Sequence, residues 1–549
     1  MQQLNRKSTT QVEKFLKGFK DTSVKGTTFD SVGSQAFVKE ETSRSESVIP
    51  ESLQVVLDSV AGETDGQARV LNAVNDAMLT YKNNHGRDLP PDVLEQALHN
   101  AYSLTPDGLK AVYDSVGTSM QSTQAYQSDR AIVAILAMTN TAIPFAHYLP
   151  ADIRSNQAKL AILEHTAGTE TGIYKDGNIL DGAHSGGRYI SSARDHLLES
   201  DGSGNWTGKI TKVQLDDDTC AQDAESVKLK RGSLLIYVDG CKSANEMTSG
   251  STVAPVAGST VIDGTTHSIS GTVNNDTGEI SLVINPELPT GSKVLAEGFI
   301  DYENQPELTP LLLTTVRTFD LFANSWRALT RQTIDSRTQM QNELGLDSYN
   351  EGVYAIQNQF SSERHYDVLR KAKRLASRNT ASFAFEWGEQ GNFKKRADIW
   401  QDFSAILGSV SQKMALLTMA YGVSHLYVGE KVGAQLQGLP SEIWQSSGIT
   451  SKAGIYRLGR LFGIYDVYYT PKGVVEGEES AEILCIGQAP DVTRNPFILG
   501  DAVAPTVIPL ATNSDLNTGA GYYARNFTSV NPHEPSAMGC ALITVTNLF

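Results

Sequence analysis

The chain has few cysteines and no surplus of basic residues, and both absences exclude classes of function. Its four cysteines, Cys220, Cys241, Cys485 and Cys540, are scattered among 549 residues without a CxxC pair. Neither a disulfide framework nor a zinc module is therefore expected, and a reducing compartment is the natural environment. Lys and Arg number 46 against 62 Asp and Glu, a net charge of −16. Proteins whose main task is to grip phosphates usually carry the opposite sign.

Long apolar runs are also missing. Polar residues and a proline, including Thr139, Pro144 and His147, interrupt the most apolar stretch, residues 131–149. This pattern is typical of a buried segment and not of a membrane span. Residues 1–7 lead into no apolar run, so no secretory signal is expected. The sequence predicts a soluble intracellular protein with no membrane partner.

Motifs that carry chemistry are absent as well. The chain has no GxxxxGK[ST] phosphate loop, no GxGxxG at a strand–helix junction, and no HExxH or GxSxG. Its ten histidines are isolated, with no two at metal-ligand spacing on one helix face. We therefore expect no catalytic, cofactor-binding or metal-binding residue, and the chain is not expected to be an enzyme. Only residues brought together from distant positions could form such a site, and the sequence alone does not reveal such groupings.

The N-terminal quarter divides into two parts. Residues 1–49 are rich in Ser and Thr and predict a flexible arm. Residues 50–127 predict a helical extension, because Val70, Val74 and Tyr81 recur at helical spacing. Helices are expected here over about 70–86, 90–101 and 105–113.

Two different β-type stretches follow. Glycines interrupt residues 166–195 so often that no hydrophobic core is expected there, and this segment should be an extended excursion that packs on something else. Strand-like segments at 233–238 and 280–284, with a hairpin signal at 274–278, predict a β-rich domain over 206–300.

The remaining chain mixes helices and strands. A strand-like stretch, 308–334, leads to a long helix predicted over 348–378, and a second amphipathic helix is predicted over 398–420. Helices that cover strands in this order indicate a compact α/β domain. The basic end of the first helix suits the helix dipole. A DNA-facing patch is the alternative interpretation of that end.

The order of these segments resembles a known family. The segments that carry the resemblance are residues 142–162, the glycine-rich ribbon after them, the strand at 327–333, the turn at 343–347, the helix ending at Arg378, residues 397–487, and the terminal stretch 495–549. Together they are similar to the major capsid proteins of tailed bacteriophages with the Hong Kong 97-type fold, closest in layout to the T-even kind. The resemblance rests on element order more than on a sharp motif.

The resemblance implies an α+β fold with an N-arm, an E-loop, a peripheral (P) domain with a spine helix, and an axial (A) domain. A helical N-terminal extension and an inserted β-rich domain would be added to it. The implied parts are a flexible arm at 1–49, the helical extension at 50–127, entry to the P domain and E-loop at 128–205, the inserted domain at 206–300, the P domain at 301–396, the A domain at 397–487, and the return to the P domain at 488–549.

Three groups of residues follow from that layout. The expected E-loop contacts with a neighbouring subunit are Ile173, Tyr174, Lys175, Ile179, Leu180 and Tyr189. The expected core face of the spine helix is Tyr349, Val353, Ile356, Phe360, Leu369 and Leu375. The expected core face of the A-domain helix is Ile399, Phe403, Ile406, Val410, Met414 and Leu417.

The implied function is that of a structural subunit that assembles with itself, as hexamers and pentamers, into an icosahedral shell around double-stranded DNA. Portal, scaffolding and decoration proteins are the further partners implied, with no sequence-specific DNA binding. The implied location is the virion capsid, assembled in the host cytoplasm. Some members of the family cross-link a loop lysine to a neighbour's asparagine. Lys175 lies at a matching loop position, but no asparagine or activating carboxylate can be matched to it.

Three rivals remain open at this stage. An encapsulin-like cellular compartment has the same fold, and the helical leader and β insertion favour a virus over it. The Thr- and Gly-rich β block suggests a surface-layer or adhesion protein. The missing signal peptide counts against that hypothesis. An enzyme would need a deep pocket with convergent titratable groups.

Overall fold

The computed structural model describes residues 10–19, 34, 37–38, 49–61, 65–103, 128–215, 217, 219–248, 250–345, 348–391, 393–510 and 517–548. The chain forms two compact units. Unit 1 comprises Met1–Ile162 and Thr318–Phe549, and unit 2 comprises Leu163–Arg317. The helix predicted over 105–113 lies outside the described residues. Both α-helices and β-sheets build unit 1, so the fold is mixed α/β.

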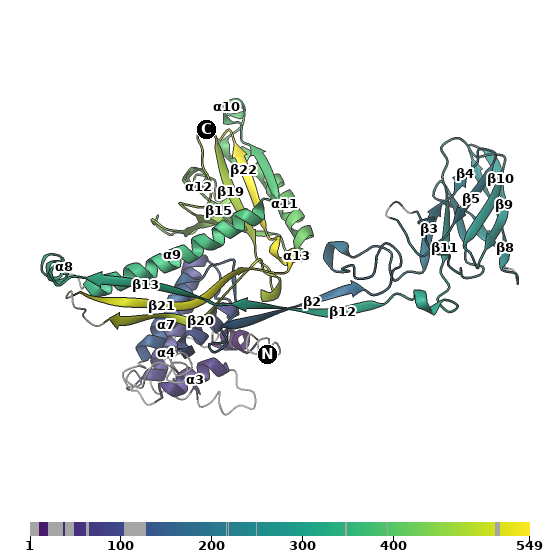
Figure 1. Ribbon diagram of the computed structural model, residues 1–549. Coiled ribbons are helices and arrows are strands. Elements are labelled where there is room, and N and C mark those ends of the chain that lie inside the picture. The colour runs from purple at the N-terminus through teal and green to yellow at the C-terminus, as the bar shows by residue number, and fades with distance from the viewer. Residues whose placement is uncertain are drawn as a thin grey trace. The chain divides into compact units, whose positions relative to one another are not determined.

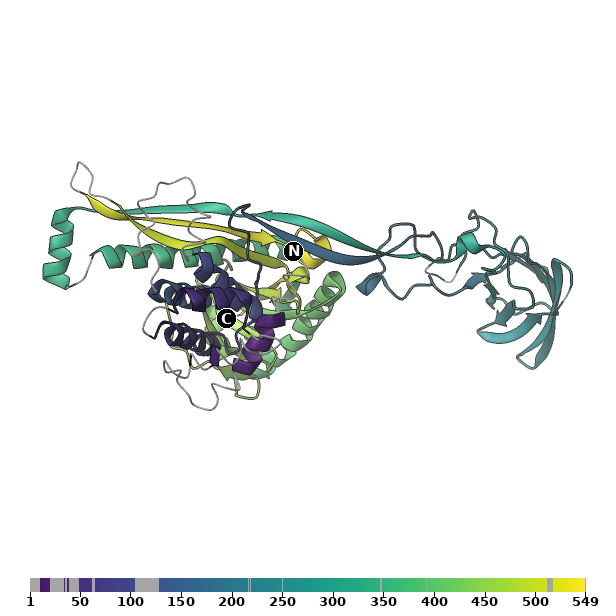
Figure 2. The same ribbon diagram turned by 90° about the horizontal axis from the view of Figure 1, so that it is seen from below.

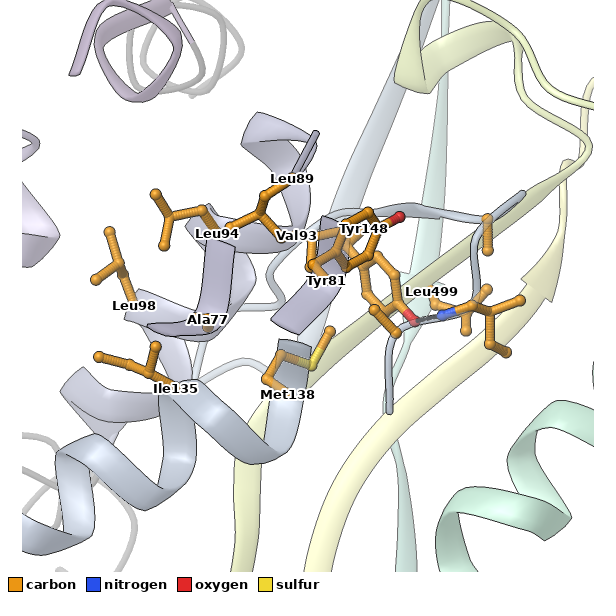
Figure 3. Close-up of a cluster of buried hydrophobic side chains, with 14 of the residues drawn as sticks. Ala77, Tyr81, Leu89, Val93, Leu94, Leu98, Ile135, Met138, Tyr148 and Leu499 are labelled. Carbon is orange, nitrogen blue, oxygen red and sulfur yellow. Dashed lines mark hydrogen bonds between the residues drawn. The ribbon is translucent and has the colours of Figure 1, made fainter. Parts of the chain in front are cut away.

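Four helices of the N-terminal region pack into the core of unit 1: α3 (Glu51–Ser59), α4 (Gly66–His85), α5 (Pro91–Ser103) and α7 (Ser128–Thr141). Helix α4 ends at Gly86, whose φ of 66° is the left-handed conformation that glycine adopts at low cost. Leu94, Ile135 and Met138 are buried where these helices meet, together with Leu499 of the neighbouring sheet (Figure 3). The helices are therefore part of the core and not an appendage to it.

The prediction of a flexible arm over 1–49 is wrong for residues 10–19, which are helical. Val12, Phe15 and Phe19 of this helix are at most 1% exposed and belong to the same core cluster. The spacing i, i+3, i+7 is that of an amphipathic helix, and it lies among polar residues whose average composition concealed it.

A four-stranded sheet carries the long strands of unit 1. Its order is β1 (His147–Tyr148), β20 (Phe497–Leu510), β21 (Thr518–Val530) and β13 (Asn324–Gln332), with β1 parallel to β20 and the rest antiparallel. Helix α9 (Ser348–Ala376) packs on β13 and β21, and Figure 2 shows it beside the long strands. Gly352 permits this approach, since a Cβ atom there would lie 2.9 Å from Thr330 Oγ1.

A seven-stranded mixed sheet forms the second layer of unit 1. Helix α11 (Arg396–Thr418) packs on β14, β15 and β22 of this sheet, and its first turn is capped by the Asp398 carboxylate, which accepts from the Lys395 backbone N–H. In sheet order the strands are β14 (Thr380–Ala384), β22 (Cys540–Thr546), β19 (Ser480–Gly487), β15 (Val423–Val428), β18 (Tyr465–Tyr469), β17 (Tyr456–Leu461) and β16 (Trp444–Ser446). The shorter helical segments of unit 1 are α8 (Ile334–Gln339), a π-helical turn (Met340–Leu344), α10 (Trp387–Gln390), α12 (Glu430–Gln437), a 3₁₀ turn (Val492–Arg494) and α13 (Glu534–Ala537).

Two paired strands, β2 (Gln157–Ala167) and β12 (Leu312–Phe322), carry the chain out of unit 1 and back (Figure 1). Unit 2 lies between them in the sequence and contains a nine-stranded sheet around its own apolar core. In sheet order the strands are β3 (Ala193–Leu197), β11 (Val294–Phe299), β6 (Leu235–Val238), β7 (Cys241–Glu246), β8 (Val253–Ile262), β9 (Thr265–Asn274), β10 (Glu279–Asn285), β5 (Asn205–Lys209) and β4 (Glu199–Ser200); two 3₁₀ turns are Gly182–His184 and Pro306–Leu308. The β-rich region thus begins at β3, earlier than the predicted start at 206.

The prediction that residues 166–195 have no core of their own is also wrong. Tyr174 and Tyr189 meet edge to face, 5.5 Å between ring centroids, and are buried with Ala167. The Tyr189 hydroxyl donates to the Leu311 carbonyl at 2.6 Å. Two tyrosines are enough to anchor a glycine-rich segment locally, because each ring buries a large area. In the described part of the chain, no helix combines the length and the apolar character needed to span a membrane.

Candidate assembly surface

An apolar strip lies exposed where β2 and β12 run through unit 2. It consists of Leu163, Leu311, Leu312, Leu313 and Val316, whose side chains are 41–57% exposed. Four of these residues lie on the paired strands, and Leu311 directly precedes β12. Because successive strand residues point to opposite faces, Leu312 and Val316 share one face of the ribbon, and Leu311 and Leu313 share the other. Single exposed apolar residues are common on protein surfaces, whereas exposed apolar residues gathered on one short ribbon are typical of interaction sites.

One of the two strands that carry the apolar strip has a free edge. Among the described strands, β2 and β12 form a two-stranded sheet. Residues 165–167 of β2 also bond to residues 177–180, so the edge without a further strand is the outer edge of β12. Glu164 and Arg317 form an ion pair across them at 3.0 Å, and His165 Nδ1 lies 3.1 Å from Thr314 Oγ1. Unpaired strand edges offer backbone donors and acceptors to another chain. A two-stranded ribbon without a further partner is at best marginally stable in water.

A second exposed surface lies on the four-stranded sheet of unit 1. Trp326 points to one face, where its ring packs 5.1 Å from that of Phe360 in α9. On the opposite face Leu329 is 63% exposed, and the Arg327 guanidinium lies 5.7 Å from the centre of the Tyr523 ring. Strand β13 is an edge strand of this sheet. A shallow hollow of about 540 Å³ on the sheet is lined by Arg327, Ala328, Leu329, Leu510, Gly521, Tyr522 and Tyr523.

The structure distributes the six expected E-loop contacts unevenly. Tyr174 and Tyr189 are buried within the chain, and Ile173 and Leu180 pack against them. Ile179 is half-buried and Lys175 is exposed. The most exposed apolar side chain of this segment is Ile190, at 77%, which the sequence did not single out.

The expected core faces of the two long helices differ in their burial. Of the six residues expected in α9, Leu369 is fully buried, and Val353, Ile356, Phe360 and Leu375 are half-buried; the side chain of Tyr349 lies outside the described residues. In α11 the buried residues are Ile399, Phe403, Val410 and Met414, while Ile406 and Leu417 are half-buried. Strand and sheet contacts cover α11 more completely than the N-terminal half of α9.

Titratable side chains gather in the core of unit 1 and not in an open cleft. The hydroxyls of two stacked tyrosines, Tyr427 and Tyr468, lie 3.1 Å from His365 Nε2 and His85 Nδ1 respectively, and His425 is fully buried beside them. Burial lowers the pKa of His85 to about 4 and those of His365 and His425 to about 3. No group of three or more His, Cys, Asp or Glu side chains is placed to hold a metal ion, within the residues that the structure describes.

Asp466 lies next to this histidine cluster with no exposed area, and three arginines, Arg87, Arg457 and Arg460, contact its carboxylate at 2.5–3.0 Å. Burial alone would raise the pKa of Asp466, but the guanidinium groups hold it below its usual value. These groups form an ionic junction around a buried carboxylate, between Arg87, which lies two residues after the end of α4, and strands β17 and β18.

No protein-family model matches the sequence, and no curated protein matches it. Phage capsids are among its structural neighbours. A chain of Microbacterium phage Oxtober96 has 13% identity and a TM-score of 0.30, with 61% of this chain and 96% of that chain covered. The capsid of Myoviridae phage XM1 has 7% identity and a TM-score of 0.29, with coverage of 59% and 89%. The SrpI encapsulin complex of Synechococcus elongatus PCC 7942 has 8% identity and a TM-score of 0.28, with coverage of 43% and 77%.

Proposed function

We propose that this chain is the structural subunit of a tailed-phage capsid, which assembles with itself as hexamers and pentamers into an icosahedral shell around double-stranded DNA. The observation that carries the proposal is the apolar strip on β2 and β12, because it combines exposed leucine and valine side chains with the outer edge of β12, which pairs with no further strand among those described. The resemblance of the element order to the Hong Kong 97-type fold supports the same function.

The energetics of the apolar strip favour a partner of the same kind. Each of its five side chains still exposes about half of its surface, so covering the strip would contribute on the order of 1 kcal/mol per residue. That sum alone does not hold two proteins together once the entropy of association is counted. A subunit that both offers such a strip and receives a neighbour's forms several contacts at once, and a closed lattice makes them cooperative.

The charge of the chain suits an interior filled with DNA. A net charge of −16 disfavours tight binding to the phosphate backbone, which would hinder packing and release of a genome. Portal, scaffolding and decoration proteins are further proposed partners, and the virion capsid, assembled in the host cytoplasm, is the proposed location. Residues Lys175, Ile179 and Ile190 are proposed to face a neighbouring subunit, since they are not buried within the chain.

Sedimentation velocity of the purified chain tests the proposal. We expect the wild type to form capsomer-sized or larger species, and Val316→Asp to remain small because a carboxylate is costly to bury without a partner. Thr290→Asp is the matched control, since Thr290 is exposed in a turn of the same unit outside the apolar strip. A wild type that stays monomeric at every concentration and ionic strength contradicts the proposal. The contents of any shell then separate the alternatives, because nuclease-protected DNA indicates a capsid and a protein cargo indicates an encapsulin-like compartment.

A further inference from the structure

Most of one face of the sheet in unit 2 is exposed and carries no charged side chain. Strands β8, β9, β10 and β5 are neighbours in the sheet, and their side chains alternate between the core and the outside. Three of the outward side chains are large and apolar: Val253, Val261 and Val283, each 46–65% exposed. The neutral face is defined here as the uncharged part of this side: Val253, Pro255, Ala257, Ser259, Val261, Thr266, Ser268, Ser270, Thr272, Ser281, Val283, Asn285, Asn205 and Thr207. At one end of the four strands the same alternation adds Asn274, Glu279 and Lys209.

The strand register places these residues in rows across the sheet. In one row Thr272 lies opposite Pro255 on one side and Ser281 on the other, and Ser281 is followed by Thr207. In the next row Ser270 lies between Ala257 and Val283. Small hydroxyl and methyl groups on such rows form a flat surface that loses little side-chain entropy when it is covered.

The absence of charge on the neutral face contrasts with the rest of unit 2. Residues 163–317 contain 11 Lys and Arg and 22 Asp and Glu, so 11 − 22 gives a net charge of −11. Charged side chains appear only at the border of the face, where Glu279 pairs with Lys209 and Glu199 lies opposite Thr207. A surface that binds a basic partner would carry carboxylates. A surface exposed only to solvent would also be expected to carry charged side chains.

We propose that the neutral face packs against the same face of unit 2 in a second copy of this chain. Two units of charge −11 repel each other, and a contact free of charge is where they approach at the least electrostatic cost. When two copies of this face meet, as in a two-fold symmetric pair, neither copy brings a charge that the other must neutralise. Flat sheets stack in this way about 10 Å apart. The second copy is supplied by the proposed function, on which this inference rests for its partner.

The size of the neutral face sets the strength of this pairing. Four strands about 4.8 Å apart span roughly 19 Å, and the eight residue steps from Val253 to Val261 span about 27 Å. The product is about 500 Å² per partner, or about 1,000 Å² in total, which is at the weak end of specific interfaces. The pairing is thus too weak to hold two free chains together at low concentration, but it adds to the contacts of a lattice.

Site-specific cross-linking tests the pairing in the full-length chain. The background is Cys241→Ser, because Cys241 is the one exposed cysteine of the four. Single cysteines are introduced as Ser268→Cys, Ser270→Cys or Thr272→Cys, three successive outward positions of β9, and treated with a short bismaleimide. We expect a covalent dimer from at least one of them and none from Thr290→Cys. Adding Val283→Asp to the reactive variant should abolish the dimer, because Val283 lies opposite Ser270 on the neutral face. Adding Thr290→Asp should leave the dimer unchanged, and both variants should keep the same unfolding temperature.

The outcomes separate this inference from the proposed function. If shells or rings form and none of the three cysteines yields a dimer, the pairing is overturned while the shell function stands. A neutral face covered by a different protein gives this same negative result. If dimers are trapped through the face and no larger assembly forms, the pairing stands and the shell function fails. A dimer that survives Val283→Asp also overturns the pairing, because it then arises from chance collisions.

Discussion

Arg364 of α9 and Asp501 of β20 form an ion pair inside unit 1, with 2.9 Å between Nη2 and Oδ1 and side chains only 7% and 3% exposed. Asn100 of α5 donates to the other carboxylate oxygen of Asp501 at 3.0 Å. Gln96, one turn earlier, accepts from the Asp501 backbone N–H and donates to its carbonyl. The long helix, the four-stranded sheet and the N-terminal helices are therefore tied together by one buried polar group.

Breaking this group should be costly. We expect Asp501→Ala to lower the free energy of unfolding of unit 1 by about 3–5 kcal/mol, because it leaves the Arg364 guanidinium buried without its counter-charge. Chemical denaturation followed by intrinsic fluorescence measures the change. The control is Asp367→Ala, which removes a half-buried carboxylate from the same helix and should cost about 1 kcal/mol or less. Equal effects of the two substitutions would contradict the role assigned to Asp501.

The N-terminal helices are expected to contribute to the stability of unit 1 as core elements. Leu94→Ala should cost about 2–5 kcal/mol, since the side chain is fully buried in the cluster shown in Figure 3. Val133→Ala in α7 is the control, because Val133 is 57% exposed. If the helices were a detachable extension, Leu94→Ala would leave the main unfolding transition unchanged, and calorimetry of the full-length chain would show it.

Acid should destabilise unit 1 before it titrates most carboxylates. His85, His365 and His425 have pKa values of about 4, 3 and 3 in the folded chain, below the ordinary value of 6.5. The unfolded chain therefore binds protons as the pH falls below about 6.5, while the folded chain does not. Stability is lost between about pH 6.5 and 4, by about 1.4 kcal/mol per pH unit for each histidine.

Measurement of the unfolding midpoint in denaturant from pH 7.5 to 4.5 tests this expectation. His425→Gln should make stability depend less steeply on pH, by the contribution of one histidine, because glutamine does not titrate. His147 contributes with the opposite sign. Burial alone would lower its pKa, but contact with the Asp92 carboxylate at 2.9 Å raises it above 6.5. Its contribution is present below pH 6.5 and disappears as the pH rises through the folded-state pKa. A flat profile between pH 6.5 and 4.5 would contradict the histidine assignment.

Tyr189 separates a local role from an assembly role. We expect Tyr189→Ala to loosen residues 167–190 within the single chain, because it removes the ring that packs on Tyr174 and the hydrogen bond to Leu311. Faster amide exchange in this segment of a non-assembled chain is the expected result. Ile190→Ala removes an exposed neighbour and should leave that exchange unchanged. If Tyr189→Ala affects only assembled material, the tyrosine acts between subunits.

Periodicity located the long elements well and the tertiary contacts poorly. The helices expected over 348–378 and 398–420 are α9 and α11, because their apolar residues recur at helical spacing over several turns. The helix at 10–19 was missed because it is short and surrounded by polar residues. Composition alone could not show that Tyr174 and Tyr189 meet across fifteen residues of glycine-rich chain.

The surfaces were harder to predict than the elements. The three histidines of the buried cluster, His85, His365 and His425, are at least 60 residues apart in the sequence. Only folding brings them around the same tyrosines. The apolar strip depends on the pairing of β2 with β12, which lie about 150 residues apart in the sequence. The neutral face depends on the register of four strands. Each of these features is a product of long-range pairing, which local patterns do not encode.

Negative-stain electron microscopy of the purified full-length chain, with the Val316→Asp variant in parallel, tests whether the chain assembles into shells. We expect closed shells or capsomer rings for the wild type and only small particles for Val316→Asp, with the same unfolding temperature for both. Small, uniform particles of the wild type under every condition of concentration and salt would contradict it.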